Sequence, residues 1–248
     1  MQCYTHTLPG GASLVGYLRE ETTEMPAFNT RPAMLILPGG GYAYCSSREA
    51  DPVAMQFLQA GYNVFILYYT CRGQESQPAL RWQPLIDAAG AILHIRKNAV
   101  QFHIDPAKVA VCGFSAGGHL AASTAILWDA EPVRQALGIC GKEALPDAVV
   151  LGYPVITSGE FRHDGSICNL CGDDAALRGT MSLENQVSDG LPPFYIWHTV
   201  EDASVPVQNS MLLATALTAH KVPFELHLFA HDGHGTCLLY TSPSPRDS

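Results

Sequence analysis

The sequence predicts an α/β fold in which a mostly parallel central sheet is covered by helices on both faces. Short apolar segments of strand length alternate along the chain with segments of helical periodicity, which is the pattern of βαβ units. A hydrophobic fraction of 47% and a charged fraction of only 15% supply a sizeable core. The 248 residues suit one large α/β domain or two small ones, and no repeat of solenoid period divides them.

The first half of the chain predicts three strands and two helices. Residues 33–37 form a continuous apolar segment, as in a strand buried on both faces, and residues 62–69 are rich in β-branched and aromatic side chains. Between residues 85 and 100, apolar side chains recur at helical spacing, which predicts an amphipathic helix that covers the sheet. A short strand at 109–112 and an alanine-rich helix at 117–127 follow.

The second half continues this alternation around one irregular segment. A buried strand is predicted at 148–153, and two more strands are predicted at 194–198 and 224–229, with a helix at 207–220 between them. Residues 157–190 are polar and poorly periodic, so we expect them to form an excursion over the functional site, with short helices.

Charge and cysteine content restrict the partners and the compartment. The formal net charge of −9 argues against nucleic acid and against an anionic membrane surface, since both bind basic faces. No apolar segment is long enough to span a membrane, and the first residues lack the pattern of a secretion signal. The eight cysteines show no disulfide-framework spacing, so we expect free thiols in a reducing cytoplasm.

The strongest functional signal is Gly113-Phe114-Ser115-Ala116-Gly117, which matches the Gly-x-Ser-x-Gly motif. A strand is predicted before the motif and a helix after it, as a nucleophile on a sharp strand-to-helix turn requires. The two glycines let neighbouring backbone pass closely, and the helix N-terminus favours developing negative charge. We therefore predict that Ser115 is a catalytic nucleophile; a capping serine at a glycine-rich helix start is the alternative.

A serine nucleophile needs a base, and the base needs an acid that orients it. The base should follow the last strand, where His231 and His234 stand, and a weak metal pair is the alternative role for them. We favour His234, because its flanking glycines let the loop bring the ring towards the serine. The loop after the preceding strand offers two acids, Glu201 and Asp202, and both suit the chemistry.

The negative charge that develops on the substrate carbonyl oxygen needs two backbone N–H donors. One should come from Ala116, which follows the nucleophile, and the other from the glycine-rich loop after the first predicted strand. Within that loop we predict Gly40 and Gly41. Tyr42 and Tyr153 lie near strand ends and are candidates for lining the substrate pocket, although packing explains them equally well.

No metal and no cofactor are expected. Cys168 and Cys171 have Cys-x-x-Cys spacing, but no second pair and no nearby histidine completes a zinc site. His198 is interpreted as a structural hydrogen-bonding residue at a strand end, and His119 as a packing residue.

The motifs, in this order along the chain, resemble those of the bacterial feruloyl- and acetylxylan-esterase-like α/β-hydrolases. The resemblance covers most of the chain from residue 30 to residue 236, and three segments carry it: 38–42, 113–120 and 198–207. It implies the α/β-hydrolase fold and a triad of Ser115, Asp202 and His234, and it thereby selects Asp202 over Glu201.

The end of the chain departs from that family, whose members continue past the histidine into a final helix. Residues 237–248 instead resemble the peptide encoded by a transposon-type DNA-library adapter. We therefore expect a catalytic domain of residues 1–236, a truncated C-terminal helix and a foreign tail that contributes little to the fold.

The resemblance implies a serine esterase that hydrolyses small, acetyl-type esters, with carbohydrate as the alcohol. Formamidases and peptidases use the same scaffold and are the alternative enzymes, and an inactive truncated fragment is the third possibility. A small-molecule ester is the expected partner, with no nucleic acid and no membrane, and the oligomeric state is left open.

Overall fold

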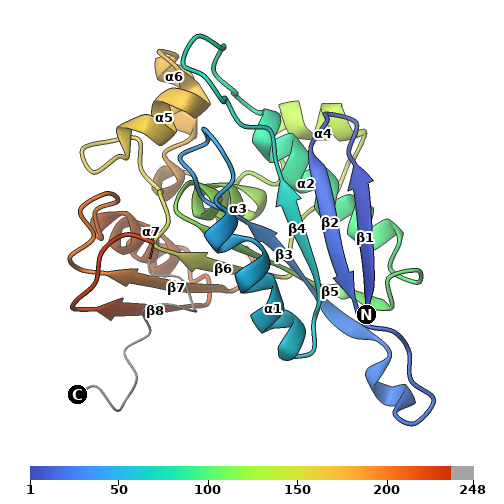
Figure 1. Ribbon diagram of the computed structural model, residues 1–248. Coiled ribbons are helices and arrows are strands. Elements are labelled where there is room, and N and C mark those ends of the chain that lie inside the picture. The colour runs from blue at the N-terminus through green and yellow to red at the C-terminus, as the bar shows by residue number, and fades with distance from the viewer. Residues whose placement is uncertain (236–248) are drawn as a thin grey trace.

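The structure, a computed structural model, describes residues 1–235 (Figure 1). The expected foreign tail and truncated final helix lie outside the described residues. The strands are β1 (Gln2–Thr7), β2 (Ser13–Leu18), β3 (Arg31–Leu37), β4 (Asn63–Tyr68), β5 (Ile104–Phe114), β6 (Ala148–Gly152), β7 (Phe194–Thr199) and β8 (Phe224–Phe229). The helices are α1 (Asp51–Gln59), α2 (Gln83–Lys97), α3 (Ala116–Ile126), α4 (Glu131–Leu137), α5 (Asp164–Cys171), α6 (Ala175–Thr180) and α7 (Gln208–Ala219), with short 3₁₀ turns η1 (Pro26–Phe28), η2 (Ser47–Glu49) and η3 (Leu183–Asn185).

The eight strands form one sheet in the order β1-β2-β4-β3-β5-β6-β7-β8. Strands β3 to β8 are parallel to one another, whereas β1 and β2 add a hairpin at one edge, in which β2 pairs antiparallel with β4. The predicted α/β fold with a mostly parallel sheet is therefore confirmed. The sequence interpretation missed the edge hairpin and the helices α1 and α4. In the hairpin, only β2 alternates between buried and half-buried side chains, and β1 is mostly exposed.

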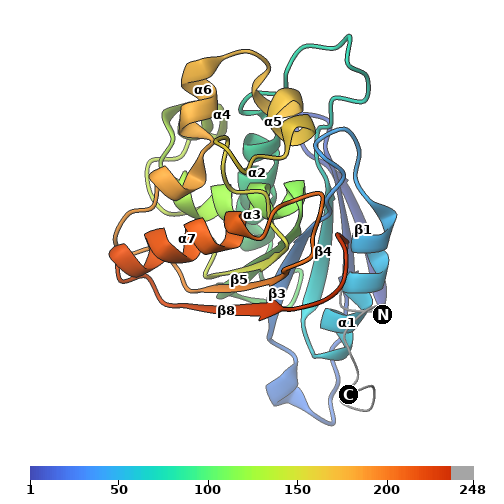
Figure 2. The ribbon, with the colours of Figure 1, turned by 90° about the vertical axis from the view of Figure 1, so that its left-hand side faces the viewer.

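Alternation along the central strands divides the core into two layers, because successive side chains point to opposite faces of a sheet. Leu35, Phe65 and Val111 face the layer that α2 and α3 cover. Ile36 and Ile66 face the opposite layer, which α1 covers. Figure 2 shows α1 on one side of the sheet and α2, α3 and α7 on the other. Each large side chain buried in these layers contributes roughly 1.5–3 kcal/mol.

The excursion between β6 and β7 contains α5, α6 and η3, as the irregular segment predicted. Its first part is held by Asn209 of α7, whose side-chain oxygen accepts the amide N–H groups of Ile156 and Thr157. The side-chain nitrogen of Asn209 donates to the carbonyl of Phe161. These bonds fix the path by which the chain returns over the sheet.

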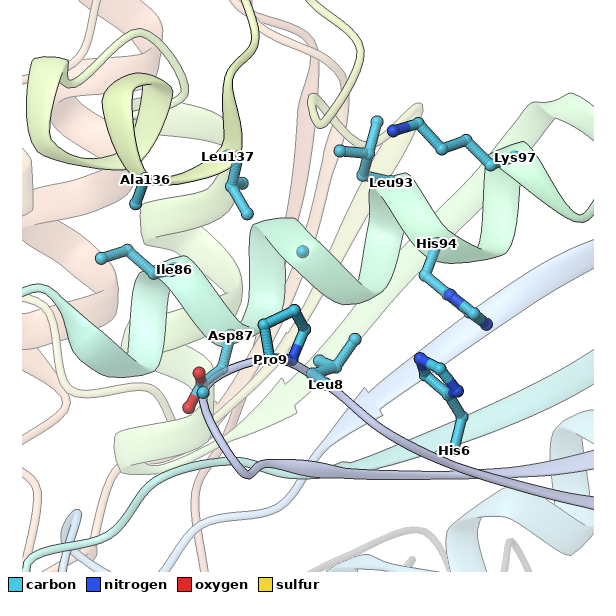
Figure 3. Close-up of a pocket in the computed structure, with 12 residues that line it drawn as sticks. His6, Leu8, Pro9, Ile86, Asp87, Leu93, His94, Lys97, Ala136 and Leu137 are labelled. Atoms are coloured by element: carbon cyan, nitrogen blue, oxygen red, sulfur yellow. The ribbon is translucent and has the colours of Figure 1, made fainter.

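A hollow of about 340 Å³ lies between the hairpin turn and α2 (Figure 3). At one end the rings of His6 and His94 stack with their centroids 4.1 Å apart. At the other end Asp87 is buried and accepts a hydrogen bond from the amide of Thr70. No predicted site residue lines this hollow.

No helix among residues 1–235 combines the length and the apolar character needed to cross a membrane. The cysteines in this part of the chain carry free thiols. Cys45 and Cys71 are neighbours, with their sulfur atoms 3.7 Å apart.

Candidate active site

Ser115 stands on the turn between β5 and α3, with backbone angles of φ 53° and ψ −120°. Residues other than glycine rarely adopt a positive φ, so the surrounding structure must hold this conformation. The amide of Ser115 donates to the carbonyl of Gly152, and its carbonyl accepts from the amides of His119 and Val155, at 3.0–3.1 Å. The turn thus places the serine hydroxyl at the edge of the sheet where the parallel strands end.

The two glycines of the motif are required by close backbone passage, as the sequence interpretation proposed. A Cβ atom on Gly117 would lie 2.1 Å from the carbonyl oxygen of Leu37 and 2.4 Å from that of Pro38. A Cβ atom on Gly113 would lie 2.1 Å from the carbonyl oxygen of Gly117. Main-chain atoms cannot move aside as a side chain can, so neither position accepts alanine without a shift of the sheet.

His234, on the loop after β8, connects the serine to an acid. Its Nε2 atom lies 2.9 Å from Oγ of Ser115, and its Nδ1 atom lies 2.7 Å from Oδ2 of Asp202. An ionised carboxylate only accepts hydrogen bonds, so Nδ1 carries the proton and Nε2 faces the serine as an acceptor. This tautomer can accept the proton of the serine hydroxyl.

Asp202 is held in a buried and hydrogen-bonded position on the loop after β7. Its Oδ1 atom accepts the amide N–H groups of Ser204 and Val205, each at 2.9 Å. Burial by itself raises the pKa of Asp202, but hydrogen bonds from His198, His234 and the amide of Val205 outweigh it and hold the pKa well below the ordinary value. The carboxylate is therefore ionised when it orients the histidine.

The second acid–histidine pair lies outside the site. Nδ1 of His231 is 3.0 Å from Oε1 of Glu201, and the His231 side chain is 86% exposed. The structure directs Asp202 and His234, the pair that the sequence analysis favoured, towards Ser115. No group of three or more histidine, cysteine or acidic side chains that could hold a metal ion occurs within residues 1–235.

The glycine-rich loop after β3 forms a tight turn next to Ser115. Gly40 has φ 123° and its carbonyl accepts from the amides of Ala43 and Tyr44. A Cβ atom at Gly40 would lie 2.1 Å from the carbonyl oxygen of Tyr44, so the turn requires glycine. Among the hydrogen bonds of residues 1–235, the N–H groups of Gly40, Gly41 and Ala116 have no acceptor.

This loop is braced from below by a buried carboxylate that the sequence interpretation missed. Glu49 is 3% exposed. Its Oε2 atom accepts the amide N–H of Gly39 at 2.7 Å, and its Oε1 atom accepts the hydroxyl of Tyr153 at 2.8 Å. The Tyr153 ring in turn lies edge-on against the ring of His234, with centroids 4.9 Å apart. The position of Glu49, an acidic residue shortly after the glycine-rich loop in the sequence, was the signal that could have pointed to this contact.

Tyr42 and Tyr153 are each only 1% exposed, so they support the site from beneath and do not line an open pocket. The Tyr42 hydroxyl is 2.8 Å from Nδ1 of His119, and Nε2 of His119 is 2.9 Å from the carbonyl oxygen of Met181. His119 is therefore a hydrogen-bonding residue, and its interpretation as packing alone was incomplete. The sequence interpretation of His198 is confirmed, because its buried ring bonds to Ser210 and to the carbonyl of Val205.

A mostly parallel sheet with a serine on a strand-to-helix turn, followed by an acid and a histidine on later strand ends, defines an α/β-hydrolase. Comparison with known proteins then identifies the family. The chain belongs to the BD-FAE family, whose model matches residues 23–156, more than half of its length.

The relatives include enzymes of xylan breakdown. The chain is 43% identical over 209 residues to endo-1,4-beta-xylanase B of Butyrivibrio fibrisolvens, in a match that covers 83% of this chain and 32% of that protein. It is 28% identical over 211 residues to an acetylxylan esterase of Xylanibacter ruminicola, with 82% and 40% covered. The chain thus spans only a third to two fifths of the length of these curated relatives.

A solved structure extends the likeness to three dimensions. The crystal structure of an acetyl ester-xyloside bifunctional hydrolase from Caldicellulosiruptor lactoaceticus is 37% identical to this chain, with a TM-score of 0.77. The match covers 92% of this chain and 80% of that one.

Proposed function

We propose that this chain is a serine esterase that removes small, acetyl-type acyl groups from carbohydrate esters. One observation carries the proposal: a hydrogen-bonded path runs from Oγ of Ser115 through both ring nitrogens of His234 to Asp202. The choice of an ester, and of a carbohydrate as the alcohol, is supported by the relatives named as acetylxylan esterase and acetyl ester-xyloside hydrolase.

In the acylation step, Oγ of Ser115 attacks the ester carbonyl carbon while Nε2 of His234 takes the hydroxyl proton. The ionised Asp202 stabilises the resulting imidazolium and keeps its orientation. When the tetrahedral intermediate collapses, the bond to the alcohol oxygen breaks and His234 delivers the proton to that oxygen. The alcohol leaves, and the acyl group remains on the serine.

In the deacylation step, a water molecule takes the place of the alcohol. His234 removes one proton from the water as its oxygen attacks the acyl carbon, and it returns that proton to Oγ of Ser115 as the acid leaves. Each cycle therefore consumes one ester and one water and restores the serine.

The negative oxygen of both tetrahedral intermediates is assigned to the unpartnered N–H groups of Ala116, Gly40 and Gly41. Gly40 and Gly41 adopt positive φ angles, and among residues 1–235 their own N–H groups have no hydrogen-bond acceptor. Losing one donor of this kind typically costs about 3 kcal/mol in the activation barrier.

A hydrolysis screen tests the function. Wild-type protein should release acetate from acetylated xylo-oligosaccharides faster than it cleaves feruloyl esters, anilides or N-formyl substrates. Ser115→Ala should abolish the activity and the labelling by an organophosphonate probe. Ser123→Ala is the matched control, since that buried serine lies in α3 and bonds to the carbonyl of His119. Full activity of Ser115→Ala, or a preference for amides, would contradict the proposal.

The partner and the compartment are part of the same proposal. The substrate is a small-molecule ester, and the location is the cytoplasm, as the cysteine content of the sequence favours. Cell fractionation of the native source tests the location.

A further inference from the structure

The excursion between β6 and β7 places a further histidine beside the candidate active site. His163 precedes α5, and its Cε1 atom lies 3.9 Å from the position that a Cβ atom on Gly41 would occupy. Oγ of Ser166 lies at the same distance from that position. His163 also interacts electrostatically with His234 and Asp202. The space beside Gly41, next to the reacting atoms, is therefore bounded by the imidazole of His163.

The segment that carries this histidine is tied to the glycine-rich loop through α5. The side-chain amide of Asn169, in α5, donates to the carbonyl of Gly41 at 2.9 Å, which ties the excursion to the glycine-rich loop. The carbonyl of Asn169 accepts from the amide of Leu80. In Figure 1, α5 and α6 lie together above the sheet. The excursion thus forms a fixed wall of the site.

The hydrogen bonds of His163 determine which ring nitrogen carries the proton. Nδ1 accepts the amide N–H of Ser166 at 3.2 Å and lies 2.8 Å from its hydroxyl oxygen. Because an amide only donates, Nδ1 is unprotonated and the proton resides on Nε2. Within residues 1–235, Nε2 of His163 has no hydrogen-bond partner. Burial, and next the neighbouring His234, lower the pKa of His163 and keep the ring neutral.

We propose that His163 determines specificity for the alcohol part of the substrate by donating a hydrogen bond from Nε2 to a sugar oxygen. This inference rests on the proposed esterase function. An acetyl group has one oxygen, the carbonyl, and that oxygen belongs at the N–H groups of Gly40, Gly41 and Ala116. Further acceptors exist only in the alcohol, which must lie near His234 because His234 protonates it. A neutral donor is suited to sugar hydroxyl and ring oxygens.

The test compares two acetyl esters that differ in the alcohol. Acetylated xylobiose offers hydroxyl and ring oxygens, whereas phenyl acetate offers no oxygen beyond the ester itself. For His163→Phe, the ratio of kcat/KM for acetylated xylobiose to kcat/KM for phenyl acetate should fall about tenfold, as expected for one lost hydrogen bond. The change should appear mainly in KM for the sugar ester. His163→Gln retains an N–H donor and should recover part of the ratio.

A matched control separates this role from general damage. His231→Phe changes an exposed histidine on the loop after β8, whose ring pairs with Glu201 at the surface, and should leave the ratio unchanged. Equal losses on both esters in His163→Phe, or an unchanged ratio, would overturn the role of His163 while the esterase function stands. Wild-type protein that cleaves phenyl acetate but no acetylated sugar would overturn the carbohydrate specificity itself, and with it the role of His163.

Discussion

Removal of the buried carboxylate beneath the glycine-rich loop should be among the most damaging single changes outside the proposed triad. Glu49 accepts hydrogen bonds from the amide of Gly39 and from the hydroxyl of Tyr153, at 2.7 and 2.8 Å. In Glu49→Ala both donors lose their acceptor in a site that is only 3% exposed. Losing each of these buried hydrogen bonds costs about 1–3 kcal/mol, so the free energy of unfolding should fall by roughly 4 kcal/mol.

Two further variants make the test quantitative. Glu49→Gln keeps one oxygen for Gly39 and turns an amide donor towards the Tyr153 hydroxyl, which can rotate to accept. That variant loses only the charge assistance of the bonds, about 1–2 kcal/mol. Tyr153→Phe removes one of the two hydrogen bonds, so its free energy of unfolding should lie between those of wild type and Glu49→Ala.

Urea unfolding and thermal melting of the three variants provide the measurement. For a chain of this length each kcal/mol shifts Tm by about 2–4 °C, so Glu49→Ala should melt roughly 8–16 °C below wild type. The same variant should lower kcat, because the carboxylate positions the loop that carries Gly40 and Gly41, the proposed donors to the oxyanion. A melting temperature of Glu49→Ala within the error of wild type would refute the assigned bracing role.

Three other changes should have separate signatures. Asp202→Asn should lower kcat by about ten-thousand-fold through the wrong histidine tautomer, whereas Glu201→Gln should leave kcat nearly unchanged; the reverse order would mean that the acid is misassigned. Burial lowers the pKa of His119 from 6.5 to about 4. As the pH falls, this histidine is therefore protonated in the unfolded chain before it is protonated in the folded protein, and the free energy of unfolding should decrease between pH 6.5 and 4 by at most about 3 kcal/mol. Urea unfolding of His119→Gln should show a flatter dependence of stability on pH. Gly117→Ala should cost more than 3 kcal/mol, because its Cβ meets main-chain oxygens at 2.1 and 2.4 Å; a normally stable, active variant would contradict this.

Local sequence patterns were sufficient for the parallel part of the sheet and for the turn that carries the candidate nucleophile. The apolar segments at β3 and β4 are buried on both faces along most of their length, and such segments can only be accommodated inside a covered sheet. The serine motif was equally readable, because Gly113 and Gly117 are needed by the turn itself. Edge elements gave a weaker signal: β1 is mostly exposed and therefore shows little apolar alternation.

The partners within the site could not be read from the chain in the same way. Glu201 and Asp202 are adjacent in sequence and chemically alike, and only the path of the loop places one on the surface and the other against His234. Glu49 and His163 belong to no sequence motif, and apart from the nearness of Glu49 to the glycine-rich loop nothing in the chain pointed to them, because they contact residues that are distant in sequence. Backbone conformation depends on neighbours along the chain, and for that reason the sequence predicted the strands and the serine turn. Hydrogen bonds across a site depend on where the whole fold brings each side chain, so only the three-dimensional structure showed which side chains are hydrogen-bond partners.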